Sequence, residues 1–250
     1  MADRRNKAQA TVLDRRGLIG GAAALAAGAA ASPVFAKMKP FTPFYGPRSR
    51  TMYVNDLSGD IDGLFATAHL ILSSTSELRG IVGSAAAAAH ESAEAATTIG
   101  REVTAMMGSK IPVHLGCVKR LGKDGGAQPS PGVQAIIDEA MRTDSTLPLY
   151  VAVGGGLTEV ATAIKIKPEI AERFTLIWIG GGSWPEGVNH EYNFMLDPDA
   201  ARFIFNETRV KLWTIPAAVY STCVISASEL QTQVAPHGKI GKFQIGRAHV

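Results

Sequence analysis

Short apolar segments alternate with segments of helical period along most of this 250-residue chain. Six of them have the length and composition of buried strands: 51–55, 78–83, 111–115, 147–153, 174–179 and 210–215. The run 147–153 is apolar without interruption, as expected of a strand covered on both faces of a parallel sheet. Since short links join successive strands and helices, the sequence predicts an α/β fold. We expect a doubly wound, mostly parallel, Rossmann-like sheet with helices on both faces.

The first predicted strand ends in a group of carboxylates. Asp56, Asp60 and Asp62 fall within seven residues, and Gly59 and Gly63 between and after them allow the backbone to turn. Open α/β sheets bind their ligands at the carboxyl ends of strands. Three acids that meet there repel one another unless a cation lies between them, and Ca²⁺ or Mg²⁺ prefers such oxygen ligands. Alternatively, Asp60 and Asp62 cap the following helix, but capping requires only one acid.

Two predicted strands end in three consecutive glycines, at 154–156 and 180–182. Glycine-rich turns of this kind can bind phosphate through backbone N–H groups. The first turn, however, has neither the Gly-x-Gly-x-x-Gly spacing nor a following Lys-Ser/Thr, so neither nucleotide-binding motif is present. We therefore expect these glycines to allow close backbone approach at the rim of a pocket.

A second polar group follows the fifth predicted strand. Glu191 and Asn193 are two residues apart, so on an extended segment their side chains point the same way. A carboxylate and an amide that point together can bind vicinal hydroxyls. The alternative is a solvated acidic loop in which Asp197 caps a helix that begins at Pro198. That alternative accounts for Asp197 but gives Glu191 and Asn193 no role, and His190 is more often a loop histidine than a catalyst.

Residues 1–36 have the features of an export signal. Arg15 and Arg16 precede the weakly apolar run 21–31, and 34–36 offers a small-residue cleavage site. The segment resembles a bacterial twin-arginine signal, which implies export of a folded protein to the periplasm. The apolar run is too short and too weakly apolar to span a membrane, so no membrane association is expected after cleavage. Residues 37–50 are Pro-rich and predict a linker.

The segment 1–36 also accounts for the formal net charge of +3, so the remainder is near neutral and no basic patch indicates nucleic acid. Cys117 and Cys223 lie far apart without a histidine at ligand spacing, which argues against a zinc site and leaves their pairing open. The last six residues, 245–250, resemble a translated sequencing adapter. We therefore expect the natural chain to continue beyond about Gln244.

Taken in order, the polar motifs resemble those of the inosine-uridine-preferring nucleoside hydrolases. Residues 56–63 resemble the family's Asp-rich motif in the variant Asp-x-x-Gly-Asp-x-Asp-Gly, and 155–159 resembles its Gly-Pro-Leu-Thr-Asn turn. Residues 180–201 resemble its second ribose motif, through Gly180-Gly-Gly, Glu191-Tyr-Asn193 and Asp197-Pro-Asp-Ala-Ala201. The resemblance covers about 52–226, and it indicates a nucleoside-hydrolase-like domain over 51–244 that is incomplete at its C-terminal end.

The resemblance implies an N-glycosidase that uses Ca²⁺ to hydrolyse ribonucleosides or related ribosyl compounds, and that forms a homo-oligomer. Asp56 matches the general base and a metal ligand, Asp62 matches the second chelating carboxylate, and Gly154 lies near the main-chain carbonyl that binds the ion. The residues that match the sugar-binding set are Asp60, Glu191 and Asn193.

Several departures from the family pattern leave two alternatives open. Val54 and Ile61 stand where the family usually has acids, which favours a non-catalytic sugar- or nucleoside-binding relative. The family's late His and last Ca²⁺-binding Asp would follow the end of this chain, so a chain shortened in this way could lack activity. The second alternative is a phosphatase of the haloacid-dehalogenase type that uses Asp-x-Asp-Gly at 60–63, although Leu64 replaces the usual Thr.

Overall fold

The computed structural model describes residues 46–247 except 60, 124–125, 127 and 183–189. Within this range the strands are β1 (Ser49–Asn55), β2 (Ser76–Gly83), β3 (Val113–Leu115), β4 (Leu149–Val153), β5 (Thr175–Ile179) and β6 (Lys211–Ile215). The predicted export signal lies outside the described residues.

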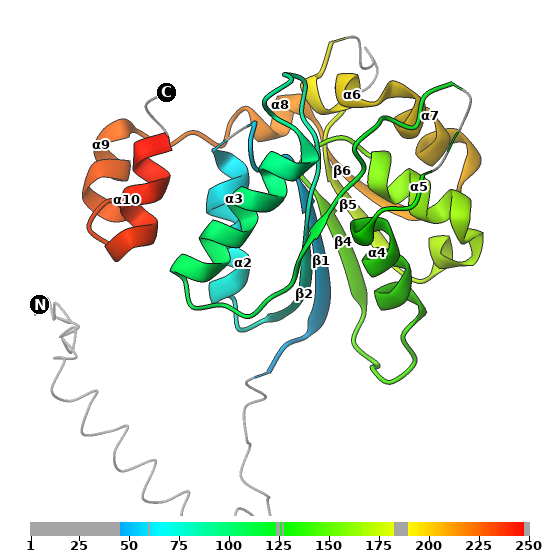
Figure 1. Ribbon diagram of the computed structural model, residues 1–250, viewed down its shortest axis with the longest axis horizontal. Coiled ribbons are helices and arrows are strands. Elements are labelled where there is room, and N and C mark those ends of the chain that lie inside the picture. Colours follow the sequence, from blue (N-terminus) through cyan, green and yellow to red (C-terminus); the bar gives the residue numbers. More distant parts are fainter. Residues whose placement is uncertain (1–45, 60, 124–125, 127, 183–189, 248–250) are drawn as a thin grey trace, which may run out of the picture. The chain divides into compact units, whose positions relative to one another are not determined.

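The six described strands form one sheet in the order β3-β2-β1-β4-β5-β6, and every neighbouring pair is parallel. This confirms the predicted doubly wound α/β fold. The direction in which the sheet grows reverses between β1 and β4, which are neighbours in space but not in sequence (Figure 1). Ligands of such sheets bind outside the carboxyl ends of the strands at this reversal.

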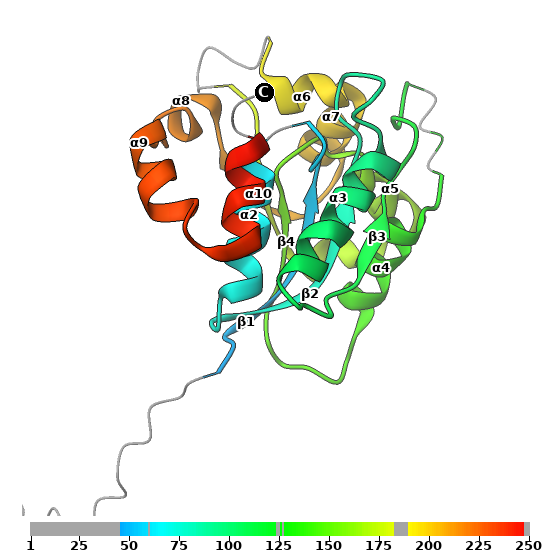
Figure 2. The same ribbon diagram turned by 60° about the vertical axis from the view of Figure 1, so that its left-hand side comes forward.

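Helices cover both faces of the sheet (Figure 1 and Figure 2). One face carries α2 (Asp62–Leu72) and α3 (Ala93–Met106), and the other carries α4 (Pro131–Met141), α5 (Thr158–Ile166) and α7 (Pro198–Glu207). The alternation of side chains along β1 shows why: Tyr53 packs in the core under α2 and α3, whereas Met52 and Val54 pack in the core under α4 and α5.

The helix starts are defined by local hydrogen bonds. The side chain of Ser92 accepts from the N–H of Ala95 at the start of α3, and Ser130 accepts from Val133 at the start of α4. Asp197 accepts from the N–H of Ala200 at 3.0 Å and so caps α7, as predicted.

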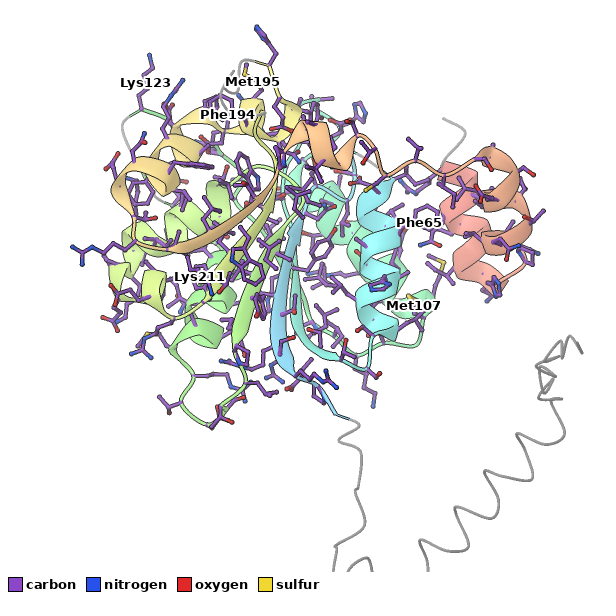
Figure 3. The ribbon with its side chains drawn as sticks, turned by 180° about the vertical axis from the view of Figure 1, so that it is seen from behind. Phe65, Met107, Lys123, Phe194, Met195 and Lys211 are labelled. Carbon is purple, nitrogen blue, oxygen red and sulfur yellow. The ribbon has the colours of Figure 1, made fainter. Side chains whose placement is uncertain are left out.

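Short helical segments join and follow these elements: η2 (Pro168–Glu172), α6 (Tyr192–Leu196), α8 (Ala217–Tyr220), α9 (Ala227–Glu229), the single π-turn η3 (Leu230–Val234) and α10 (Gly238–Arg247). Helix α10 packs against α2, and the Gln244 amide donates to the Leu64 carbonyl at 3.1 Å. Phe65 and Met107 line the groove between the C-terminal helices and the sheet-covering pair α2 and α3 (Figure 3).

Residues 245–247, which we attribute to an adapter on sequence grounds, are the last three of α10, and Ile245 is buried. The attribution stays a prediction. No described helix is both long and apolar enough to cross a membrane.

Candidate functional site

A pocket of about 450 Å³ lies at the carboxyl ends of the central strands. Its wall includes Asp56, Asp62, Gly154, Glu191, Asn193 and Tyr220. Five of the six residues predicted from sequence therefore meet in one pocket, and the sixth, Asp60, lies outside the described residues. A larger hollow of about 990 Å³ lies between α5, η2 and α7, but none of the predicted residues lines it.

Asp56 is the most buried acid of the pocket, with only 2% of its surface exposed. It follows β1 directly, and its carbonyl accepts the N–H of Gly59 at 2.7 Å, which closes the turn predicted there. A methyl group at Gly155 would lie 3.4 Å from the Asp56 carboxyl carbon. Gly155 therefore lies in van der Waals range of the carboxylate, in the turn between β4 and α5.

Asn55 is a site residue that the sequence analysis missed. Its side chain is buried, and its amide donates to the Gly154 carbonyl at 3.0 Å, which joins the end of β1 to the end of β4. A Cβ at Gly63 would lie 1.9 Å from the Asn55 side-chain oxygen, so only glycine fits there. Gly63 and Gly154 were visible in the sequence, but their contact with Asn55 in the fold was not.

Asp62 is the first residue of α2, and its side chain is exposed. The N-cap residue is Ile61, and it makes no side-chain hydrogen bond to the helix. The capping alternative therefore does not account for Asp62. Its charge acts on the neighbouring core: burial, then Asp62, then Asp56 raise the pKa of Tyr53 well above its ordinary value.

The donor set of this wall fits a hard cation. Asp56 and Asp62 supply carboxylate oxygens and Gly154 supplies a carbonyl oxygen, which are the ligand types that Ca²⁺ and Mg²⁺ prefer. Three donors are fewer than the roughly six to eight oxygens that Ca²⁺ takes, so substrate hydroxyls and water would complete the shell. Among the residues that the structure describes, no group of three or more His, Cys, Asp or Glu is arranged to hold a metal ion.

Glu191 is buried and accepts four hydrogen bonds. Its Oε2 accepts from the N–H groups of Gly181 and Phe194, both at 2.8 Å. Its Oε1 accepts from the N–H of Asn193 and the hydroxyl of Tyr220, both at 3.0 Å. Because each carboxylate oxygen has about two acceptor positions, these four bonds nearly saturate the group.

The predicted extended conformation of this segment is wrong. Glu191 is the N-cap of the short helix α6, which begins at Tyr192, so Glu191 and Asn193 do not share a direction by strand alternation. Instead the Asn193 amide donates to the Ile179 carbonyl at 2.8 Å, while Glu191 turns back over its own helix start. Both still line the pocket, because α6 lies at the carboxyl end of the sheet (Figure 1).

Tyr220 is the second residue that the sequence analysis missed. It ends α8, and its hydroxyl donates to Glu191 within the pocket. Partial burial, and then this bond, raise the pKa of Tyr220 to about 12, so the hydroxyl keeps its proton at neutral pH. The local sequence around Tyr220 carries no motif that indicates this contact.

These features define the class of protein: an α/β protein with a Rossmann-like sheet and an acidic pocket at the carboxyl ends of the strands, where the strand order reverses between β1 and β4. The profile of the family described as inosine-uridine preferring nucleoside hydrolase matches residues 55–247, and this chain belongs to that family.

Individual relatives agree with this assignment. The inosine-uridine preferring nucleoside hydrolase of Leishmania major is 35% identical over 79 residues, which is 30% of this chain and only 25% of that protein. The chain thus aligns with about a quarter of that relative's length.

Two solved structures share the fold. The plant nucleoside hydrolase PpNRh1 has a TM-score of 0.66 at 18% identity, covering 81% of this chain and 70% of its own. The purine-preferring ribonucleoside hydrolase of Gardnerella vaginalis has a TM-score of 0.64 at 21% identity, and the match covers 78% of this chain and 69% of that protein.

Proposed function

We propose that this protein hydrolyses the N-glycosidic bond of ribonucleosides or related ribosyl compounds. One observation carries the proposal: Asp56 and Asp62 share a single pocket with Glu191 and Asn193. Two of the relatives are named as an inosine-uridine preferring nucleoside hydrolase and a purine-preferring ribonucleoside hydrolase, which supports the same substrate class.

Asp56 has the properties required of the general base. Its carboxylate is buried at the pocket wall, where it can take a proton from a water molecule. The water oxygen then bonds to the anomeric carbon while the carbon–nitrogen bond breaks. The electron pair of the broken bond leaves with the nucleobase. Negative side chains beside the sugar stabilise the positive charge that develops on it.

Ca²⁺ is the metal that we propose for this pocket, held by Asp56, Asp62 and the Gly154 carbonyl. When bound, such an ion would orient the ribose hydroxyls and acidify the attacking water. Asn55 contributes by holding the Gly154 turn in place through its 3.0 Å bond to that carbonyl.

Sugar binding is assigned to other residues of the same pocket. Asn193 and the Tyr220–Glu191 pair present an amide and a hydroxyl group to the pocket, and Asp60 completes this set as a prediction. Because the Glu191 carboxylate already accepts four bonds, it can receive a substrate hydroxyl only by exchanging one of them, and the Tyr220 hydroxyl is the side chain that can move.

A specific observation supports the non-catalytic alternative. Val54, where the family usually has an acid, is fully buried in the apolar core between the sheet and α4 and α5, so it contributes nothing to the pocket. Val54 therefore supplies neither a metal ligand nor a proton acceptor, as expected of a relative that binds ribose without turnover.

A nucleoside panel decides between these functions. The chain is incubated with inosine, guanosine, adenosine, uridine and cytidine, and released ribose is measured with Ca²⁺, with a chelator, and after Ca²⁺ is restored. Chelator-sensitive release supports the proposal. Ribose binding by calorimetry without release of any base supports the binding alternative, and phosphatase activity with a fluoride-trapped aspartyl group supports the phosphatase.

A further inference from the structure

A second, smaller pocket of about 200 Å³ lies on the other side of the glycine turn that follows β4. Its wall includes Ser84, Cys117, Lys119, Arg120, Gly156 and Glu159. These residues come from the end of β2, the segment after β3, and the start of α5, so the pocket opens at the same carboxyl edge of the sheet as the substrate pocket.

Two side chains of this pocket are buried and carry a polar atom that no described residue satisfies. Glu159 is 1% exposed, and its Oε1 accepts from the N–H of Cys117 at 2.9 Å, whereas its Oε2 has no partner within the described protein. Ser84 is 2% exposed, and its hydroxyl has none either. A buried polar group without a partner costs about 1–3 kcal/mol, so two such residues in the wall of one cavity indicate a ligand.

The pocket adjoins the proposed general base. A methyl group at Gly155 would lie 3.2 Å from the Ser84 hydroxyl and 3.4 Å from the Asp56 carboxyl carbon. Ser84 and Asp56 therefore flank the same glycine. On the other side, a Cβ at Gly59 would lie 2.9 Å from Ala86, which lines the pocket, and 3.5 Å from the Asp56 Oδ2.

The chemistry of the wall selects a small neutral ligand. Burial is the main cause that raises the pKa of Glu159 to about 7. The hydrogen bond from the N–H of Cys117 lowers this pKa, and the charge of Asp197 raises it by a smaller amount. The Glu159 carboxyl is therefore partly protonated near neutral pH, and it can donate to one water and accept from another. Burial also raises the pKa of the Cys117 thiol to about 12, so the thiol stays neutral.

The other charged residues near Glu159 do not form an anion-binding site at the bottom of this pocket. The Asp197 carboxylate accepts from Leu121, Thr158 and Ala200, and lies behind the pocket wall. Lys119 and Arg120 are exposed residues at the rim. A volume of 200 Å³ has room for about six waters at roughly 30 Å³ each.

We propose that this pocket is a water-binding subsite in which Ser84 and Glu159 hold the water molecules that the hydrolysis at Asp56 consumes. Ser84 and Glu159 are then positioning residues. The role of the subsite in supplying water to the reaction rests on the proposed function, whereas the binding of water in the pocket does not. In each turnover one water leaves the subsite, its proton passes to Asp56, its oxygen bonds to the anomeric carbon, and solvent refills the subsite past the exposed rim.

The competition between water and methanol tests this role. Wild type, Ser84→Ala, Ser84→Thr, Glu159→Gln and Glu159→Met are assayed on a responsive nucleoside in aqueous methanol, and the ratio of methyl riboside to ribose is measured. Ser84→Ala and Glu159→Met should lower kcat about tenfold, the equivalent of roughly one lost hydrogen bond, with KM within about twofold. They should also shift the products toward methyl riboside, because the water is no longer held.

Conservative variants and one control separate positioning from folding. Ser84→Thr and Glu159→Gln keep a polar atom in place and should retain most of the wild-type product ratio. Thr98→Ala, on the exposed face of α3, should change nothing. Unaltered product ratios and kcat in Ser84→Ala and Glu159→Met, with the wild type active, would overturn the supply role while leaving the proposed function intact.

A high-resolution crystal structure decides the water site itself. Ordered water within hydrogen-bond distance of the Ser84 hydroxyl and the Glu159 Oε2 is the expected result, and its absence overturns the subsite. If the wild type hydrolyses no nucleoside, the proposed function fails and the supply role fails with it, whereas the electron density still decides whether the pocket binds water.

Discussion

The hydroxyl of Tyr220 donates to the carboxylate of Glu191 over 3.0 Å, and this bond connects α8 to the N-cap of α6 across the proposed substrate pocket. Glu191 also binds the N–H of Gly181, whose φ of +85° places it in the left-handed region that favours glycine. One carboxylate thus holds together three segments that follow β5 and β6. The same carboxylate forms part of the pocket wall.

Replacing Tyr220 by Phe should weaken substrate binding and stability together. The variant removes one of the four bonds to Glu191, so we expect a loss of about 1 kcal/mol in the free energy of unfolding and a rise in KM of about fivefold. Urea denaturation and steady-state kinetics measure both. Tyr150→Phe, on β4 away from the pocket, is the matched control, and equal KM values for Tyr220→Phe and wild type would contradict the role.

Replacing Asp56 by Asn should abolish turnover and weaken metal binding at once, because the same carboxylate is proposed as base and ligand. We expect a decrease in kcat of at least about a thousandfold and loss of the Ca²⁺-dependent rise in melting temperature. Asp138→Asn, an exposed acid of α4, serves as the control. Wild-type rates in the Asp56 variant would remove this residue from the mechanism.

Glu159 should make the protein less stable as the pH rises. Its pKa is about 7 in the folded chain and 4.5 when unperturbed, so between these values the folded chain binds more protons than the unfolded chain. Stability contributed by this group is therefore complete below 4.5 and is lost as the pH rises through 7, by on the order of 3 kcal/mol. Urea denaturation across this window should give a flatter pH dependence for Glu159→Gln than for wild type; identical slopes would contradict the burial effect.

Adding one methyl group at Gly63 should be far more damaging than adding one at Gly126. The new Cβ at Gly63 would lie 1.9 Å from the Asn55 side-chain oxygen, whereas the one at Gly126 would meet nothing within 4 Å. We expect Gly63→Ala to lower the free energy of unfolding by about 2–4 kcal/mol and to displace Asn55 from the Gly154 carbonyl. Gly126→Ala should stay within about 0.5 kcal/mol of wild type; a similar loss in both would rule out the steric explanation.

The twin-arginine hypothesis predicts that export depends on Arg15 and Arg16. Replacing both by Lys should retain the protein in the cytoplasm of a bacterium with that pathway, because the paired guanidinium groups are the part of the signal that is recognised. Immunoblots of periplasmic and cytoplasmic fractions measure the distribution. Replacement of Arg4 and Arg5 by Lys leaves the pair intact and is the control, and undiminished periplasmic protein in the Arg15/Arg16 variant would disprove the assignment.

Most of the fold follows from local patterns in the chain. The apolar runs and their spacing predicted all six described strands and the doubly wound sheet. Burial on both faces leaves the central strands little choice of composition, whereas the edge strands β3 and β6, which are more exposed, were indicated by their apolar runs alone. The same patterns placed Asp56, Asp62, Gly154, Glu191 and Asn193 at one edge, since parallel strands end together.

The contacts that complete the site depend on residues far apart in sequence, so no local pattern could indicate them. Asn55 meets Gly154, and Ser84 and Glu159 line one cavity, only after β1, β2 and β4 are aligned. Tyr220 meets Glu191 only after the segments that follow β5 and β6 come together. The conformation at Glu191 depends on both local and tertiary contacts. Its carboxylate caps α6 through the nearby N–H groups of Asn193 and Phe194, and it also accepts from the N–H of Gly181 after β5 and from the Tyr220 hydroxyl. A buried charge must be hydrogen-bonded, and only the tertiary structure supplied the two distant partners.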